Sequence, residues 1–156
     1  MISLWLKMNC HFTDEEKEAC ISTIDRLLEL ANKARREGIL SLEEDADTEQ
    51  KNLFLKYGLE VFMSADIDET RKVLQNLIWA DNCTGSELLK RFIILEGLTS
   101  IIQGENPRLL EFKLTALLGE KYIISVWENA RKESQEAYKM YIKSLEKSIV
   151  EPLTTL

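Results

Sequence analysis

Apolar residues recur at intervals of three and four along most of the chain, with charged and polar residues between them. This spacing places the apolar side chains on one face of an α-helix. No stretch alternates apolar and polar residues strongly enough to predict a β-strand. We therefore expect an all-α fold, a compact multi-helix domain of about six helices with a long C-terminal helix. The periodic stretches predict a helix from Thr13 to Gly38, a short helix from Ser41, and helices through residues 53–62, 73–78, 88–102, 107–118 and 121–148.

Capping signals mark several of the expected helix starts. Residues 13–16 (TDEE) and 41–44 (SLEE) both fit the capping-box pattern, with a Thr or Ser N-cap followed by Glu three residues later. Asp66 or Asp68 is expected to cap the helix that follows the turn at 65–68.

Glycines mark the expected helix ends. Gly38 and Gly104 each stand just after the last apolar residue of a predicted helix, where a residue with positive φ commonly ends the helix. Asn106 and Pro107 follow at once and fit an N-cap and a first helical residue. The chain is therefore expected to stop one helix at Gly104 and begin the next at Pro107.

Composition and charge narrow the class of protein. The chain has 156 residues, of which 45% are hydrophobic and 30% charged, so a hydrophobic core can form without disulfides. We treat residues 1–156 as a single domain, with a first segment at 13–80, a second segment at 86–118 and the long helix at 120–148. The formal net charge of −7 argues against a nucleic-acid partner.

No stretch of the sequence predicts a membrane span. The longest segments without a charged residue, 73–80 and 97–104, are far shorter than the roughly 20 residues that cross a bilayer. The N-terminal apolar run is also short for a signal peptide. We expect Leu4, Trp5, Leu6 and Phe12 to dock on the core, with a peripheral membrane anchor as the alternative.

Two longer segments carry a more specific pattern. The first reads ARREGILSLEE over 34–44 and is followed by FLKYGL at 54–59 and DIDE at 66–69. The second reads ILEGLTSIIQGENPR over 94–108, with Lys113-Leu114 behind it. In this order they resemble the cytoplasmic loop of MotA-family flagellar stator subunits and the segment after the last transmembrane helix of that family.

The chain also departs from that family. MotA-family subunits have two proton-pathway helices between these segments, whereas here about a dozen residues, 80–91, join them, too few for two membrane spans. Ion conduction by this chain is therefore excluded. Residues 120–156 match no part of the family.

The resemblance implies a non-catalytic protein-interaction module of the bacterial motility apparatus. It would bind or modulate the flagellar motor, with the rotor switch-complex protein or a stator subunit as partner. The expected location is the cytoplasm, with the inner face of the cell membrane as an alternative. The oligomeric state is left open.

The family's cytoplasmic loop binds the rotor through charges, and the motif places the matching charges at Arg35 and Glu43, with Arg36 and Glu44 beside them. Gly38 would let the chain reverse, so that all four share one corner. A second interpretation is local, because cations suit the last turn of a helix and anions the first turn of the next.

Other chemistry-bearing residues have simpler explanations. Trp79 and Trp127 are expected to be core aromatics, and Glu105 and Arg108 to take part in helix initiation. Cys20 and Cys83 are expected to be small buried residues, and His11 lacks metal-ligating neighbours in sequence. No phosphate-binding Gly-rich loop or hydrolase motif occurs. We therefore expect no catalytic residues, no metal and no cofactor.

A second functional hypothesis is a divergent regulatory or ligand-sensing helical domain that is no longer tied to motility. Its signature would be a pocket between residues 88–118 and the long helix, lined by Trp127 and Tyr138. The two hypotheses differ at Arg35 and Glu43: exposed and unpaired charges favour partner binding, and internal salt bridges favour the alternative.

Overall fold

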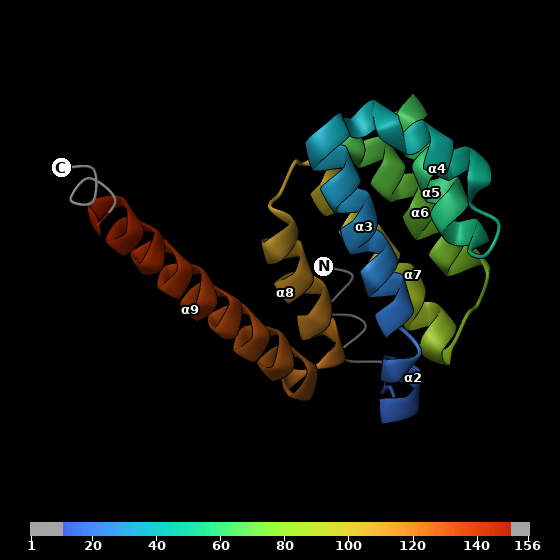
Figure 1. Cartoon of the computed structure of the whole chain (residues 1–156). Coiled ribbons are helices and arrows are strands. Elements are labelled where there is room, and N and C mark those ends of the chain that lie inside the picture. The colour runs from blue at the N-terminus through green and yellow to red at the C-terminus, as the bar shows by residue number, and fades with distance from the viewer. Residues whose placement is uncertain (1–10, 151–156) are drawn as a thin grey trace. The chain divides into compact units, whose positions relative to one another are not determined.

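The structure is a computed structural model that describes residues 11–150, and every regular element within this range is helical (Figure 1). The all-α prediction is confirmed. Leu4, Trp5 and Leu6, which were expected to dock on the core, lie outside the described residues, as does Cys10. Among the described helices, none has the combination of length and apolar character that a bilayer span requires.

The helices follow one another with short connections. In chain order they are α2 (Asp14–Glu18), α3 (Ile21–Glu37), the 3₁₀-helix η1 (Ile39–Leu42), α4 (Glu43–Thr48), α5 (Leu53–Ser64), α6 (Ile67–Ala80), α7 (Gly85–Ile102), α8 (Pro107–Leu118) and α9 (Glu120–Val150).

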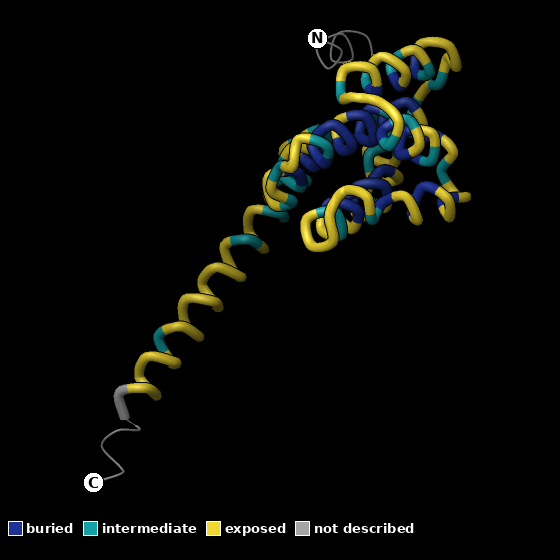
Figure 2. Tube along the Cα trace, turned by 90° about the horizontal axis from the view of Figure 1, so that it is seen from above, coloured by how far each residue is buried: buried dark blue, intermediate teal, exposed yellow. Residues whose placement is uncertain are grey.

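The chain divides into two compact units, the first ending at Leu117 and the second beginning at Leu118. The second unit is dominated by α9, on which all described residues from 131 to 141 are exposed (Figure 2). Three of its aromatic side chains, those of Trp127, Tyr138 and Tyr141, are exposed too.

The core of the first unit is built around α7. Helices α3, α5 and α6 all pack against α7, and α2 contacts it as well. Most of α7 is buried, including the consecutive residues 92–95 and 97–101. A helix surrounded by other helices needs apolar residues on every side, which explains why the apolar residues of α7 do not form a single stripe.

Two glycines allow close approach of helices in this core. A Cβ atom at Gly97 of α7 would come within 2.7 Å of Leu27 Cδ1 on α3, and one at Gly58 of α5 within 2.5 Å of Leu98 Cδ1 on α7. Leu27 and Leu98 are almost completely buried. Gly58 and Gly97 thus serve helix packing.

Most of the expected caps are present. Thr13 and Glu16 form the predicted capping box, in which the Glu16 amide donates to Thr13 Oγ1 (3.2 Å) and the Thr13 amide to Glu16 Oε2 (2.9 Å). Asp66, rather than Asp68, caps α6. Asn106 Oδ1 accepts a hydrogen bond from the Arg108 amide (3.0 Å), and α8 begins at Pro107 as predicted.

Two predicted features near the N-terminus are wrong. The helix expected from Thr13 to Gly38 is interrupted between α2 and α3, where the buried Cys20 donates from its thiol to the Glu16 carbonyl (3.3 Å). The second capping box is absent: Ser41 lies inside η1, and its hydroxyl donates to the Gly38 carbonyl (2.6 Å). A residue with helical backbone cannot take the extended conformation of a capping-box N-cap.

The aromatic predictions also need correction. Trp79 and Trp127 are both exposed, at 56% and 59%, so neither is a core residue. Trp79 lines an apolar cavity of about 160 Å³ between the end of α6 and the start of α7, together with Ile78, Cys83 and Phe92. Cys83 is only partly buried, whereas Cys20 is fully buried as expected.

Candidate partner-binding site

The four predicted charged residues lie on either side of a sharp chain reversal. Arg35 and Arg36 are in the last turn of α3, and Glu43 and Glu44 are in the first turn of α4. Gly38 ends α3 with φ of 87° and ψ of 161°, a backbone conformation that residues with a side chain rarely adopt. The chain then turns through η1, which packs on both α3 and α4. We call Arg35, Arg36, Glu43 and Glu44 the charged corner.

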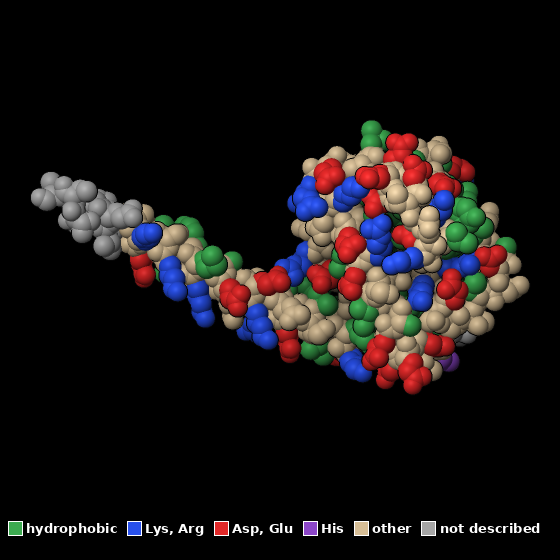
Figure 3. Space-filling view, turned by 45° about the vertical axis from the view of Figure 1, so that its right-hand side comes forward, with side chains coloured by type: hydrophobic (Ala, Val, Ile, Leu, Met, Phe, Trp, Pro, Cys, Tyr) green, Lys and Arg blue, Asp and Glu red, His purple; other side chains and the backbone are tan. Residues whose placement is uncertain are grey.

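The side chains of the charged corner are available to a partner. All four residues are exposed, and neither arginine nor Glu43 forms an ion pair with any residue in the described part of the chain. Glu44 makes a long contact with Lys33 (3.6 Å) and is still 82% exposed. Leu40, in η1 between the two pairs, is 80% exposed and adds an apolar contact at the tip. Side chains of both charges are interspersed on the surface of the first unit (Figure 3).

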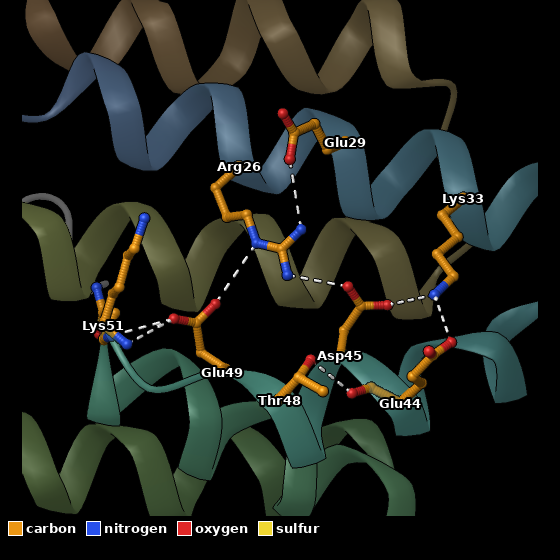
Figure 4. Close-up of polar contacts among 9 residues, drawn as sticks. Arg26, Glu29, Lys33, Glu44, Asp45, Thr48, Glu49 and Lys51 are labelled. Carbon is orange, nitrogen blue, oxygen red and sulfur yellow. Dashed lines mark hydrogen bonds and ion pairs between the residues drawn. The ribbon is translucent and has the colours of Figure 1, made fainter.

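Behind the charged corner lies an ion network that holds α4 against α3 (Figure 4). Asp45 accepts from Arg26 through Oδ1 (2.9 Å) and from Lys33 through Oδ2 (2.7 Å). Glu49, one helical turn further, accepts from Arg26 Nε (3.5 Å). The side chains of Asp45 and Glu49 are only 12% and 9% exposed, so these pairs are shielded from water much more than ordinary surface pairs.

The electrostatics of the network favour its charged form. Burial opposes ionisation of Asp45, but hydrogen bonds from Lys33 and Arg26 and their positive charges outweigh it, and the pKa of Asp45 lies below its ordinary value. The hydrogen bond to Asp45 raises the pKa of Lys33. All three groups are therefore charged at neutral pH.

Glu49 also fixes the connection from α4 to α5. Its Oε1 accepts hydrogen bonds from the backbone amides of Lys51 (3.1 Å) and Asn52 (3.2 Å). Asn52 in turn caps α5 by accepting from the Leu55 amide (3.0 Å). The network thus anchors both ends of α4, and with it the position of Glu43 relative to Arg35.

Sequence reasoning missed this network, because residues 43–50 were interpreted as a polar stretch before the next helix. A signal was present. Asp45 and Glu49 are four residues apart and share a face of α4, while Arg26 and Lys33 are seven apart, two turns along one face of α3. Acidic residues on one face of a helix and basic residues on one face of its neighbour point to an interhelical network.

The remaining candidate residues are held by local contacts or lie exposed. Glu105 accepts hydrogen bonds from Lys113 Nζ (2.6 Å) and from the Ser100 hydroxyl, which together hold the pKa of its carboxyl below the ordinary value. Burial raises the pKa of the Cys20 thiol to about 11, so it stays protonated at neutral pH. His11 is exposed, and the described residues contain no cluster of side chains suited to a metal ion.

Comparisons with known proteins identify no relative. No protein-family model matches the chain, and no curated protein or solved structure matches it significantly. The resemblance to MotA-family stator subunits therefore stays a prediction that rests on the two segments at 34–69 and 94–114.

Proposed function

We propose that this chain is a non-catalytic protein-interaction module that resembles the cytoplasmic portion of MotA-family flagellar stator subunits. It binds a motor component in the cytoplasm, either the rotor switch-complex protein or a stator subunit, and modulates the motor sterically and electrostatically. The charged corner is its contact surface.

The observation that carries this proposal is the contrast between the charged corner and the network behind it. Arg26, Lys33 and Asp45 satisfy one another, whereas Arg35 and Glu43 project from the same two helices without an ion-pair partner among the described residues. Exposed charges with fixed positions can match a complementary pattern and accelerate encounter. The alternative interpretation is helix-end electrostatics, which explains the signs of the four charges. It does not explain why an ion network holds α4 against α3 directly behind them.

The ligand-sensing alternative has weaker support. It predicted a pocket lined by Trp127 and Tyr138 and internal salt bridges at Arg35 and Glu43. The apolar cavity beside Trp79, between α6 and α7, is small for an organic ligand. The exposure of Arg35 and Glu43 favours partner binding by the criterion set from the sequence.

The test is capture of purified rotor switch-complex protein and of stator subunit by the immobilised chain, at low and physiological salt. The Arg35→Glu/Glu43→Lys variant reverses two charges of the corner without changing net charge. We expect salt-sensitive capture by the wild type and a loss of about tenfold or more in the variant.

The matched control is Arg131→Glu/Glu136→Lys, a charge-neutral reversal of two exposed residues on α9. This control should retain capture. Failure of the wild type to capture either motor protein at any salt concentration would refute the proposed function.

A further inference from the structure

Helix α9 carries large side chains that are exposed along most of its length (Figure 2). Ile124, Tyr138, Tyr141 and Leu145 are each at least 41% exposed. A helix in water gains most of its stability from burying one face against another element. We therefore expect this face of α9 to be covered in solution.

The exposed face follows the spacing of a coiled coil. Steps of three and four residues alternate from 124 to 148, so these positions lie along one side of the helix and can face a second helix. We call the eight residues at these positions the α9 seam: Ile124, Trp127, Arg131, Ser134, Tyr138, Tyr141, Leu145 and Ser148. The opposite side is charged, with Lys132, Glu136, Lys139 and Lys143. A helix with this division buries its seam and keeps its charged side in water.

The α9 seam is complementary to itself when two copies run in opposite directions. A register centred on residue 136 places Arg131 of one copy beside Tyr141 of the other, and Ser134 beside Tyr138. A guanidinium group over a tyrosine ring is a favourable cation–π contact, and a serine hydroxyl can hydrogen-bond a tyrosine hydroxyl. Each contact occurs twice, because such a pair of helices has a two-fold axis.

A parallel pair lacks this complementarity. In register, each seam residue would meet its own copy, so two Arg131 side chains would share one layer and repel each other. The charges along α9 also favour opposite directions. Residues 120–136 carry four acidic and three basic side chains, whereas residues 137–150 carry one acidic and three basic. An antiparallel pair sets the more acidic half against the basic half, which orients the two helices.

We propose that α9 pairs with α9 of a second copy of this chain, as an antiparallel helix pair along the α9 seam. The inference is independent of the proposed function, since the charged corner is formed by α3 and α4. An anionic membrane suits this helix less well. Helices that lie in a membrane surface carry mainly Lys and Arg on the polar face, whereas α9 carries five acidic and six basic side chains.

The size of the contact predicts a weak dimer. Residues 124–148 span about 37 Å and a helix is about 12 Å wide, so the two copies together would bury roughly 900 Å². Interfaces below about 1,200 Å² belong to weak or transient complexes, and the arginine and two serines make the seam partly polar. We expect a dissociation constant of about 10–100 μM.

Sedimentation equilibrium of the full chain over a wide range of concentrations tests the pairing. The wild type should shift from monomer toward dimer across the micromolar range. Tyr138→Glu places a carboxylate in the seam and should raise the dissociation constant by about tenfold or more. A wild-type chain that stays monomeric at about 500 μM would overturn the inference.

The matched control is Met140→Glu, the same kind of change two residues away. Met140 is 71% exposed and Tyr138 is 66% exposed, but Met140 lies on the side of the helix opposite the seam. Met140→Glu should change the dissociation constant by less than about twofold. Circular dichroism of both variants should show the helix content of the wild type. An equal loss of pairing in both variants would contradict a contact through the seam.

A charge exchange tests the direction of the helices. Arg131→Glu alone should weaken pairing by about threefold or more. Arg131→Glu/Tyr141→Arg should restore pairing, because an antiparallel pair sets the new carboxylate beside the new guanidinium group. In a parallel pair each introduced charge would meet its own copy. Absence of recovery would therefore refute the antiparallel register.

Two further results would also overturn the inference. The first is dimerisation that Tyr138→Glu leaves unchanged, which would place the contact outside the α9 seam. The second is binding of a monomeric chain to vesicles of anionic lipid that Tyr138→Glu abolishes, which would make the seam a membrane surface. Loss of pairing should leave the capture of motor proteins through the charged corner unchanged, so the two proposals fail independently.

Discussion

Asp45 is the residue on which the geometry of the candidate site depends most. It is 9% exposed yet charged, and it binds cations from two positions on α3. A buried charge is tolerated only when its partners satisfy it, and removing one partner leaves the others poorly solvated. Its neighbour Glu44 touches the same Lys33 from an exposed position. Asp45 therefore carries a structural charge, whereas Glu44 carries a surface charge.

Replacing Asp45 should destabilise the fold, and replacing Glu44 should not. We expect Asp45→Asn to lower the free energy of unfolding by about 2 kcal/mol, since the partly exposed Arg26 and Lys33 can recover some hydration. Glu44→Gln should cost less than about 0.5 kcal/mol, as for an exposed pair. Urea unfolding of both variants at neutral pH measures the difference. Equal effects of the two substitutions would contradict the assignment of Asp45 as the centre of the network.

The same substitution should change the response to acid. The pKa of Asp45 is lower in the folded chain than its unfolded value near 4, so its contribution is complete above that pH and is lost as the pH falls through the folded pKa. Glu105 behaves in the same way. Asp45→Asn should therefore flatten the acid limb of the stability curve without abolishing it. The pKa of Lys33 is raised from 10.5, and its contribution is lost only as the pH rises through that higher value.

At the scale of elements, α7 organises the first unit, and Gly97 sets its distance from α3. A methyl group at this position would lie 2.7 Å from Cδ1, 3.0 Å from Cδ2 and 3.2 Å from Cγ of Leu27. All three atoms belong to a fully buried side chain, so the whole side chain must move. The glycine is thus used for close packing, at some cost in helix propensity.

Gly97→Ala should destabilise the chain by about 1–2 kcal/mol, because overpacking outweighs the gain in helix propensity. Leu27→Ala alone should cost about 2–5 kcal/mol through the cavity it leaves. In the Leu27→Ala background the added methyl group fits, and Gly97→Ala should become neutral or stabilising. A double-mutant cycle from urea unfolding measures this coupling. If the effects of the two substitutions on the free energy of unfolding were strictly additive, the added methyl group at position 97 would not contact the Leu27 side chain.

The element scale also shows what the sequence could predict. The helix starts at Thr13, Asp66 and Pro107 could be predicted because each cap depends on only a few adjacent residues. The break between α2 and α3 was not predicted, because it depends on Cys20. The Cys20 thiol donates to the nearby carbonyl of Glu16 and to the distant carbonyl of Ser86. A tertiary contact of this kind leaves no periodic signal.

The candidate site was predicted only in part. The charged corner was found because a motif placed Arg35 and Glu43 around Gly38. The network of Arg26, Lys33, Asp45 and Glu49 depends on which helices pack together, and spacing along one helix does not give that information.

At the scale of the whole molecule, the buried core and the charged corner belong to the same part of the chain. The buried apolar side chains of the described chain all lie between Cys20 and Leu118, so α9 contributes none of them. The first unit thus carries the charged corner and all of these buried side chains except that of Leu118. Partner recognition is expected to reside in this unit.

The most direct test of this claim is site-specific photo-crosslinking in the presence of rotor switch-complex protein and stator subunit. A photoreactive residue replaces Leu40, which is 80% exposed at the tip of the charged corner, or, as the control, Leu53, which is 59% exposed at the start of α5. We predict a crosslink to one of the two motor proteins from position 40, its loss with Arg35→Glu/Glu43→Lys, and none from position 53. No crosslink from position 40, or equal crosslinking from both positions, would contradict recognition through the charged corner.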